Sequence, residues 1–390
     1  MTPRLLRSIN SQAVLQLLRD HSPCSCADLA RLSGLSAPTV ASSVALLESL
    51  KLVTRLGNGP SSGGRPPTLL EFNSTFGYVV GMEITATHIR TRIADLNGAC
   101  AGEREEVIGK KSDPRSVVKQ LARQFADLRS VLRIPAKRML TAGVSAPGIT
   151  DVDAGVVTFV SGMTNWEDVP LAELVKNETG LDTVVENDVN LSALAERWHG
   201  IAKDEKNFAF VSVGRGVGAG LFINGELFHG PEWTAGEIGY LYAPANGTSF
   251  TQKSRAGALE TSIGSEGIEA QWLRAGRTPK LSALQILDLA LTGDADAVQI
   301  VQREAAILAA VCTTLSLVIN CPLIVMGGEL GGHESLFRAT ASLLERNEFA
   351  RPRLVVSPLG RDAALTGAVR LALQRTAIFP VPVSRVPQLS

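Results

Sequence analysis

The sequence has 390 residues, of which 45% are hydrophobic and 19% are charged. That length exceeds one ordinary domain, and the hydrophobic share excludes a mainly disordered chain. The 38 basic and 38 acidic residues give a net charge of zero, so the overall charge argues neither for nor against nucleic-acid binding.

Cysteine use and hydropathy indicate the compartment. An odd number of scattered cysteines argues against a disulfide framework and favours a reducing environment. We find no signal-peptide pattern and no apolar run of about 20 residues that would span a bilayer. We therefore expect a cytoplasmic protein without a membrane partner. The cysteines are Cys24, Cys26, Cys100, Cys312 and Cys321.

A segment near the N-terminus has the pattern of a helix-turn-helix. Ser25, with Asp28 three residues on, is a helix start of the capping-box kind. Gly34 supplies a tight turn, and Ser36 is a good cap for a second helix. An earlier helix, predicted over about Ser11 to Arg19, adds apolar residues to the same small core.

The second helix of this segment is predicted to read DNA. Val40, Val44 and Leu47 recur at the spacing of one buried helical stripe. Side chains off that stripe are expected to face a major groove. These candidate base-contacting residues are Ser36, Thr39, Ser42 and Ser43.

A β-hairpin wing is predicted to follow. Two β-like runs, Leu52 to Leu56 and Thr68 to Phe72, flank a loop rich in Gly, Pro and Ser. Arg65 in that loop is expected to enter a minor groove, while Lys51 and Arg55 contact phosphates. A three-helix scaffold without a nucleic-acid role is the alternative interpretation.

Strands followed by helices occur twice in the rest of the chain, which predicts two α/β lobes of related design with a ligand cleft between them. We place a winged helix-turn-helix domain at 1–72, the two-lobed region at 76–375 and a tail at 376–390. Predicted strands are Tyr78 to Ile84, Ile89 to Asp95, Thr141 to Ser145, Thr183 to Glu186, Phe208 to Val213, Gly218 to Ile223, Leu323 to Met326 and Leu354 to Val356. Predicted helices are Asp113 to Leu132, Asp188 to His199, Asp294 to Asn320 and Ala363 to Leu373.

The two-lobed region resembles the ROK family of repressors and sugar kinases. The resemblance runs from Gly77 to about Leu373 and rests on motifs in this order: APGI (146–149), NWEDVPL (165–171), ENDVNLSALAE (186–196), VSVGRGVGAGLFINGELFHG (211–230), GEIGY (236–240), GALE (257–260), VMGGEL (325–330) and LGRDAALTGA (359–368). It implies a ribonuclease H-like, actin-type ATPase fold. With the helix-turn-helix in front, the chain is similar to the transcriptional-repressor branch, whose members resemble regulators of sugar catabolism.

The resemblance implies a damaged phosphate loop. Kinases of the family carry D-x-G-x-T at the first hairpin, whereas this chain reads Glu83-Ile84-Thr85-Ala86-Thr87. Two side chains replace glycines where phosphates must touch backbone. A second glycine loop carries Arg215 where kinases have a small polar residue. We therefore predict no kinase activity, although a sugar or amino-sugar kinase stays as the alternative because Asp188 matches the family's catalytic base.

The resemblance also implies an effector site for a sugar. The matching positions are Asn187, Asp188, Glu237, Tyr240 and Glu260. Tyr240 replaces a family histidine that touches sugar and zinc, and Met163 replaces a sugar-binding asparagine. Short polar side chains of this kind pair with the vicinal hydroxyls of a sugar.

The family's zinc site is absent from the sequence. Its cysteine cluster reads Thr251-Gln252-Lys253-Ser254-Arg255-Ala256-Gly257-Ala258-Leu259-Glu260, without a thiolate. Because structural zinc needs four ligands, we predict no zinc and no other cofactor.

These observations predict a dimeric or larger homo-oligomeric repressor of carbohydrate-utilisation genes. It binds double-stranded operator DNA, and a small-molecule effector, a sugar or sugar derivative, sets its operator affinity. Control by a protein partner in place of a sugar, and activation in place of repression, stay open at the level of sequence.

Overall fold

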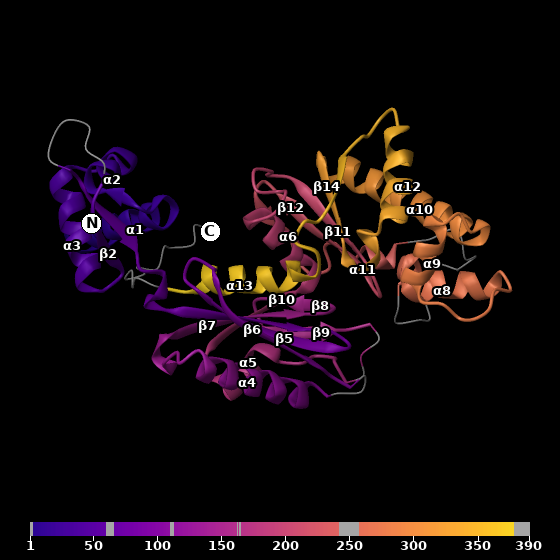
Figure 1. Ribbon diagram of the computed structural model, residues 1–390, viewed down its shortest axis with the longest axis horizontal. Helices are drawn as coiled ribbons and strands as arrows, with labels where there is room; N and C mark the ends of the chain where they lie inside the picture. The colour runs from indigo at the N-terminus through magenta and orange to yellow at the C-terminus, as the bar shows by residue number, and fades with distance from the viewer. Residues whose placement is uncertain are drawn as a thin grey trace.

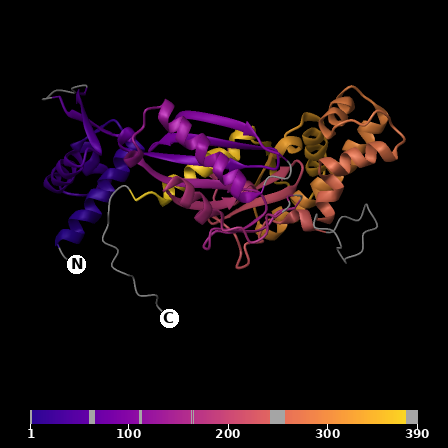
Figure 2. The ribbon, with the colours of Figure 1, turned by 90° about the horizontal axis from the view of Figure 1, so that it is seen from below.

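The computed structural model describes residues 3–59, 66–109, 113–161, 163, 165–241 and 257–377, with side chains from Leu6 onward. Three bodies follow one another along the long axis (Figure 1). We call them the head (residues 3–72), the first lobe and the second lobe. Figure 2, turned by 90°, shows the same succession.

The head is a winged helix-turn-helix. The predicted capping box is present: Ser25 accepts a hydrogen bond from the Asp28 backbone, and the Asp28 carboxylate accepts one from Ser25 N. Gly34 takes a φ of 69°, where a side chain would be strained. The first helix is longer than predicted. The head contains α1 (Pro3–His21), β1 (Cys24–Ser25), α2 (Cys26–Ser33), α3 (Ala37–Ser49), β2 (Val53–Asn58) and β3 (Thr68–Phe72), with the strands in the order β1-β3-β2.

The first lobe is a five-stranded sheet covered on both faces. Its order is β10-β7-β4-β5-β6, in which β4, β5 and β6 are antiparallel and β7 and β10 run parallel to β4. Helices α4 and α5 cover one face and α13 the other (Figure 1). The bounds are η1 (Ser74–Phe76), β4 (Tyr78–Ile84), β5 (His88–Asp95), β6 (Cys100–Val107), α4 (Pro114–Val131), η2 (Ala136–Arg138), β7 (Met139–Ala146), β8 (Ile149–Asp151), β9 (Val156–Phe159), α5 (Leu171–Thr179), β10 (Asp182–Asn187) and α13 (Ala363–Arg375).

The second lobe repeats this design. Its sheet order is β13-β12-β11-β14-β15, again three antiparallel strands with two parallel ones added at the first strand. Counted within each lobe the order is 3-2-1-4-5, so the predicted pair of related ribonuclease H-like lobes is confirmed. The bounds are α6 (Asp188–Trp198), β11 (Phe208–Val213), β12 (Val217–Ile223), β13 (Glu226–Leu227), η3 (Ile238–Tyr240), α7 (Ala258–Ile263), α8 (Ser265–Arg274), α9 (Ala283–Leu291), α10 (Ala295–Ile319), β14 (Leu323–Gly327), α11 (Gly328–Gly331), α12 (Glu334–Glu345), β15 (Arg353–Val356) and η5 (Gly360–Asp362).

Two helices lie between the sheets and connect the lobes. Helix α6 packs on β11 and β12, α13 packs on β4 and β7, and the two helices pack on each other. Glycines permit this close approach: a Cβ on Gly367 would lie 2.0 Å from the Leu191 carbonyl oxygen, and one on Gly143 would lie 2.1 Å from that of Ala368. The backbones therefore meet directly at these two points.

Helix α10 corrects one expectation from the sequence. It is the one helix among the described residues that is long and apolar enough to cross a bilayer by length and composition, whereas we expected none. Half of its most apolar window is buried in the second lobe, where it packs on α9 and α12. Core helices of this kind pass the same test, so the match is weak evidence for a membrane span.

A buried carboxyl on α10 makes stability depend on pH. Glu304 is fully buried; its Oε1 accepts a hydrogen bond from Gln271 at 2.5 Å, and its Oε2 has no partner among the described residues. Burial raises the pKa of Glu304 to about 7, against the opposing effects of Gln271 and Arg303. Because the folded state holds this proton more tightly, the stabilisation is complete below the unfolded pKa and is lost as the pH rises through 7.

We expect Glu304→Gln to remove this pH dependence. Between pH 5 and pH 8 the wild-type protein should lose about 2 kcal/mol more unfolding free energy than the variant. Urea unfolding at the two pH values measures the difference. The exposed Glu345 on α12 gives the control, since Glu345→Gln should leave the wild-type dependence unchanged. Equal pH dependence in wild type and Glu304→Gln would contradict the assignment.

Candidate functional site

The face of α3 that is predicted to read DNA is exposed only in part. Ser42 is exposed, and Ser36 caps the helix by accepting a hydrogen bond from Thr39 N. The Ser36 and Thr39 hydroxyls also bond to each other at 2.8 Å. A base edge that engages either hydroxyl must therefore compete with this internal contact.

Ser43 is a wrong prediction as a base-contacting residue. Its side chain is 1% exposed, in line with Val40, Val44 and Leu47. These positions are i, i+3, i+4 and i+7, which is the full width of an apolar helical stripe. The sequence interpretation used i, i+4 and i+7 and left out the i+3 position.

The two neighbouring serines should respond oppositely to a charged side chain. Ser43→Arg is expected to lower the unfolding free energy of the head by about 3 kcal/mol or more, because it places an unpaired charge in a small core. Ser42→Arg should change it by less than about 0.5 kcal/mol. Calorimetric unfolding of the full chain compares them. A stable, folded Ser43→Arg protein would show that the helix is rotated from the described orientation.

The predicted phosphate contacts are placed only in part. Lys51 is exposed at the end of α3, and its carbonyl oxygen accepts a hydrogen bond from Asn73. Arg55 on β2 donates two hydrogen bonds to Glu48 on α3, at 2.5 and 3.0 Å. This pair joins the wing to the recognition helix, so Arg55 must leave Glu48 or share it to reach a phosphate. Arg65 lies outside the described residues.

Of the three carboxyl groups predicted to contact the effector, Glu237 lies within electrostatic reach of both Asp188 and Glu260. Burial raises the pKa of Asp188 to about 6, against hydrogen bonds from backbone N–H groups, including that of Val189. Burial, followed by the charges of Asp188 and Glu260, raises the pKa of Glu237 to about 7. Burial also raises the pKa of Glu260. Near neutral pH this group offers both ionised acceptors and protonated donors to ligand hydroxyls. With Tyr240 we call it the acidic site.

The acidic site lies at the junction of the two lobes. Glu260 Oε1 accepts a hydrogen bond from Ser161 Oγ of the first lobe at 3.0 Å, and its carboxylate accepts one from the backbone of Val217 in the second lobe. Asn187 caps α6 by accepting from Val189 N and Asn190 N, and its Nδ2 donates to the Gly148 carbonyl at 2.9 Å. A change in the separation of the lobes must therefore alter this site.

The two residues that depart from the family pattern have different surroundings. Tyr240 is 37% exposed, and burial with the charges of Glu237 and Glu260 raises its pKa to about 12. It therefore stays a neutral hydroxyl beside the carboxyls. Met163 is 8% exposed and packs in the core of the first lobe with Trp166. Its contribution is core packing.

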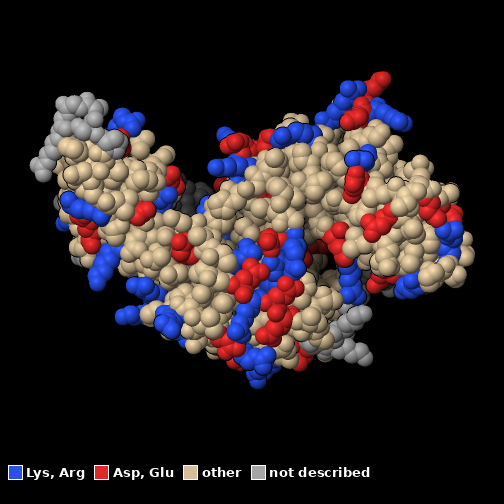
Figure 3. All heavy atoms as spheres, in the orientation of Figure 1, with Lys and Arg blue, Asp and Glu red and all other residues tan. Residues whose placement is uncertain are grey.

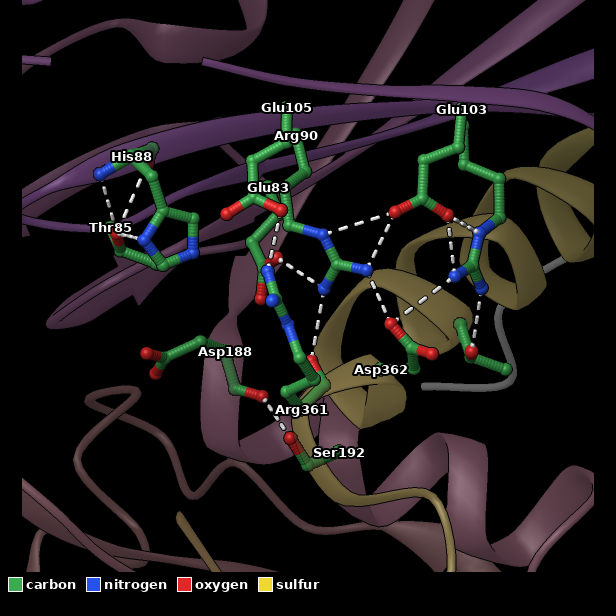
Figure 4. Close-up of polar contacts among 12 residues, drawn as sticks. Glu83, Thr85, His88, Arg90, Glu103, Glu105, Asp188, Ser192, Arg361 and Asp362 are labelled. Atoms are coloured by element: carbon green, nitrogen blue, oxygen red, sulfur yellow. Dashed lines mark hydrogen bonds and ion pairs between the residues drawn. The ribbon is translucent and has the colours of Figure 1, made fainter. Parts of the chain in front are cut away.

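The hairpin that carries Glu83 to Thr87 is closed by its own side chains. Thr85 Oγ1 accepts a hydrogen bond from His88 N and contacts the His88 ring nitrogen Nδ1 at 2.9 Å (Figure 4). It also accepts a hydrogen bond from Thr87 N. These contacts hold the β4–β5 turn without glycine. The backbone N–H groups of Thr87 and His88 are consequently occupied.

A buried arginine lies beside this hairpin. Arg90 is 3% exposed and donates to Glu83 at 3.2 Å, to Glu103 at 2.7 Å and to Asp362 (Figure 4). It also donates to the Arg361 carbonyl at 3.0 Å. Its partners come from β4, β6 and the turn before α13. We call Arg90, Glu83, Glu103 and Asp362 the Arg90 cluster.

One guanidinium compensates the three carboxylates unequally. Burial is the largest effect on Glu103 and Asp362 and opposes their ionisation, but the hydrogen bonds and charges of Arg90 and Arg92 together outweigh it and lower both pKa values, with Arg361 adding to the effect at Asp362. Burial raises the pKa of Glu83 to about 7 despite Arg90, and the Asp188 charge adds to the rise. Figure 4 shows the Asp188 carboxylate directed away from the cluster. Glu83 thus electrostatically links the cluster to the acidic site.

The second glycine loop carries an exposed cation, Arg215. Arg215 lies 3.7 Å from Glu266 on α8 and lowers the pKa of Glu260 against the effect of burial. Glu266 is itself 80% exposed, so this contact is loose. Arg215 is available to an anionic group that approaches the acidic site.

Sequence reasoning missed two buried polar contacts. The Arg90 cluster joins residues up to 272 positions apart, although the alternation Arg90-x-Arg92 opposite Glu103-x-Glu105 on neighbouring strands was a usable signal. Glu186 on β10 contacts His229 of the second lobe, Oε2 to Nε2, at 2.6 Å. No spacing rule connects those two positions.

Surface charge adds no strong preference for an anionic partner. Figure 3 shows acidic and basic side chains interleaved over the first lobe around β6, and mixed signs on the visible face of the head. The β6 side chains Glu103, Arg104, Glu105 and Glu106 pair with Arg90, Arg92, Asp127, Arg361 and Arg123. This face is therefore internally neutralised.

Comparison with known proteins assigns both parts of the chain. Residues 79–375 match the description "ROK family", and residues 7–54 match "Winged helix-turn-helix DNA-binding". A putative xylose repressor of Caldicellulosiruptor sp. (strain Rt8B.4) is 26% identical over 392 residues, covering 96% of this chain and 98% of the relative. A crystal structure of a ROK family transcriptional regulator, a homologue of the E. coli MLC protein, has a TM-score of 0.78 at 22% identity and covers 95% of this chain and 97% of that one.

Sugar kinases match a smaller part of the chain. A glucokinase of Halalkalibacterium halodurans is 27% identical over 318 residues, which cover 76% of this chain and 96% of the kinase. The kinase thus matches about three quarters of the chain, whereas the repressor and the regulator match nearly all of it. The chain belongs to the ROK family and, with a winged helix-turn-helix DNA-binding module ahead of its ROK domain, it is a DNA-binding transcriptional regulator of the repressor type.

Proposed function

We propose that a sugar or sugar derivative bound at the acidic site sets the operator affinity of this repressor and so controls genes of carbohydrate use. Relatives that match nearly the whole chain are named xylose repressors, which makes D-xylose the first effector to test. The observation that carries the proposal is the grouping of Asp188, Glu237 and Glu260 at the junction of the lobes. Glu260 accepts a hydrogen bond from each lobe, from Ser161 in the first and from the Val217 backbone in the second.

The mechanism follows from that position. A ligand that bridges Asp188 and Glu260 favours one separation of the lobes over another, and only such a difference in affinity shifts a conformational equilibrium. Two heads on a homodimer would meet two half-sites of a pseudo-palindromic operator, and a change in their spacing changes operator affinity. We place the protein in the cytoplasm, where its DNA lies.

We propose further that the protein is not a kinase. The Arg90 cluster and the closed Thr85–His88 turn support this, because backbone N–H groups that would cradle phosphate are engaged and glycines are absent. Retained Asp188, with a pKa of about 6, is the observation that favours a kinase instead. Sugar-dependent release of ADP from ATP, abolished by Asp188→Asn, would establish that alternative.

We propose that the protein binds no structural zinc. The family's cysteine cluster, set against Thr251 to Glu260, has no thiolate here; of these positions, Thr251 to Ala256 lie outside the described ranges. Metal analysis of the purified full chain is expected to give less than one zinc per protomer.

The function is tested by DNA selection followed by a sugar panel. An operator is selected from random DNA with the full chain, and its affinity is measured by fluorescence anisotropy at two salt concentrations against excess random DNA. We expect specific, salt-sensitive binding that D-xylose or another sugar weakens. Specific binding that no sugar changes, together with no heat of sugar binding, would favour a protein partner as the controlling signal.

A further inference from the structure

Helix α6 connects the acidic site to the place where the head is seated. Asp188 begins the helix and Trp198 ends it, so the two lie about 15 Å apart along one rigid element. At its far end, the Trp198 ring packs on the turn between β5 and β6: a Cβ on Gly98 would lie 2.3 Å from Trp198 Cη2. The Arg370 guanidinium of α13 covers the same ring at 5.2 Å from its centroid.

The turn that receives Trp198 is stiff. Asp95 Oδ1 accepts hydrogen bonds from Asn97 N and Ala99 N, each at 2.9 Å. Gly98 N donates to the Asp95 carbonyl at 2.9 Å. A side-chain cap across residues 95–99 and a backbone bond across residues 95–98 close the turn, so it moves as a unit. We call residues 95–98 the seat.

The head rests on this seat through Leu96. Leu96 N donates to the Ser74 carbonyl in the segment that leaves the head, and the Leu96 carbonyl accepts a hydrogen bond from Arg19 Nη2 of α1 at 2.9 Å. The Leu96 side chain is fully buried in the same hydrophobic cluster as Val14 and Leu18 of α1. All three groups of one residue thus fix the head.

Arg19 is committed to this contact. It is half-buried at the end of α1, its guanidinium covers the Phe72 ring at 5.5 Å, and burial lowers its pKa. Arg370 is also half-buried, and burial followed by the Arg19 charge lowers the Arg370 pKa. Two like charges, Arg19 and Arg370, therefore lie within electrostatic reach of each other beside this contact.

We propose that Arg19 and Trp198 are positioning residues that transmit a change at the acidic site to the DNA-binding head, with the seat between them. A shift of α6 moves Trp198 against Gly98, and the seat carries Leu96 and therefore α1 with it. The sugar-dependent part of this inference rests on the proposed function; the mechanical link between Trp198 and the head does not.

The first test needs no ligand. Hydrogen exchange of the α1 amides is followed by mass spectrometry in wild type, Arg19→Gln, Trp198→Leu and the double variant. We expect each single substitution to speed exchange in the last turn of α1, by about tenfold for Arg19→Gln. The double variant should exchange no faster than the faster single variant, because both substitutions loosen the same contact between the seat and the head. Unchanged α1 exchange in Trp198→Leu, or fully additive effects, would overturn the proposal.

Two matched variants distinguish loss of the contact between the seat and the head from general destabilisation. Arg129 on α4 makes the same kind of contact, a half-buried guanidinium donating to the Ile134 carbonyl at 3.2 Å within the first lobe. Arg129→Gln should leave α1 exchange at the wild-type rate. Trp198→Phe keeps an aromatic ring against Gly98 and should restore most of the protection lost in Trp198→Leu.

The second test measures regulation. The operator Kd is determined with and without D-xylose, and we expect a change of about tenfold in wild type. In Arg19→Gln and Trp198→Leu the ratio should fall below about twofold, while the sugar-free operator Kd and the D-xylose Kd each stay within about threefold. A retained ratio would overturn the proposal. Absence of D-xylose binding in wild type would count against D-xylose as the effector. Hydrogen exchange in the single and double variants would then test the link between Trp198 and the head by itself.

Discussion

Arg90→Met is expected to lower the unfolding free energy of the first lobe by about 3–5 kcal/mol, because it leaves the buried Glu83 carboxylate without its cation and removes the ion pairs to the partly exposed Glu103 and Asp362. Arg90 is 3% exposed and bonds to Glu83, Glu103 and Asp362, while Glu83 is 6% exposed. Removing one partner of a buried ion pair costs more than the pair contributes, since the remaining charge stays desolvated. Urea unfolding of the full chain at pH 7 measures the loss.

Two further variants make this result specific. Arg104→Met on the neighbouring strand removes an exposed pair with Asp127 and should cost less than about 1 kcal/mol. Adding Glu83→Gln to Arg90→Met should restore part of the stability, because Glu83 then carries no charge to bury. A loss below about 1 kcal/mol for Arg90→Met would show that solvent or another cation reaches these carboxylates.

Asp188→Asn is expected to weaken effector binding by about 10- to 100-fold and to abolish the sugar response of operator binding. The carboxylate lies at the start of α6 and is the acidic-site group that matches the family's base position. Hydrogen bonds to a charged group contribute about 1.5–3 kcal/mol, which corresponds to that range. Calorimetry with D-xylose and operator anisotropy with and without sugar measure the two effects.

The control is the same Asp-to-Asn substitution at an exposed position that is not part of the acidic site. Asp204, exposed in the turn after α6, should tolerate Asp204→Asn with an unchanged sugar Kd. Operator affinity without sugar should stay near wild type in both variants. A sugar Kd within about threefold of wild type in Asp188→Asn would remove the acidic site from the model of regulation.

Local sequence signals located the elements well. The strands Tyr78–Ile84 and Phe208–Val213 were predicted to the residue, and the capping box of Ser25 and Asp28 formed as expected. These features depend on neighbours within a few positions, where alternation, capping side chains and glycine turns act directly. The error at Ser43 was also local, because the buried stripe of the helix was taken to include positions i, i+4 and i+7 but not i+3.

The candidate site was predicted only as far as family motifs reached. Asp188, Glu237 and Glu260 were named from matching positions, and in the structure Glu237 lies within electrostatic reach of both other carboxyls. The motifs did not indicate three further features of the structure. Asn187 is occupied in capping α6, Met163 belongs to the core of the first lobe, and Arg90 lies beside the hairpin that carries Glu83 to Thr87. Charge compensation of this kind depends on side chains from separate strands and turns.

The sequence by itself determined the two modules, their order, most strands and helices, and the family. It did so because periodicity, caps and ordered motifs are local or collinear with the chain. Only the tertiary structure decided which polar groups pair, as at Arg90 and Asp362, and how Leu96 contacts the head between Arg19 and Ser74. Such contacts join residues 22 to 272 positions apart, and their energies come from desolvation and close packing, which exist only after the chain has folded.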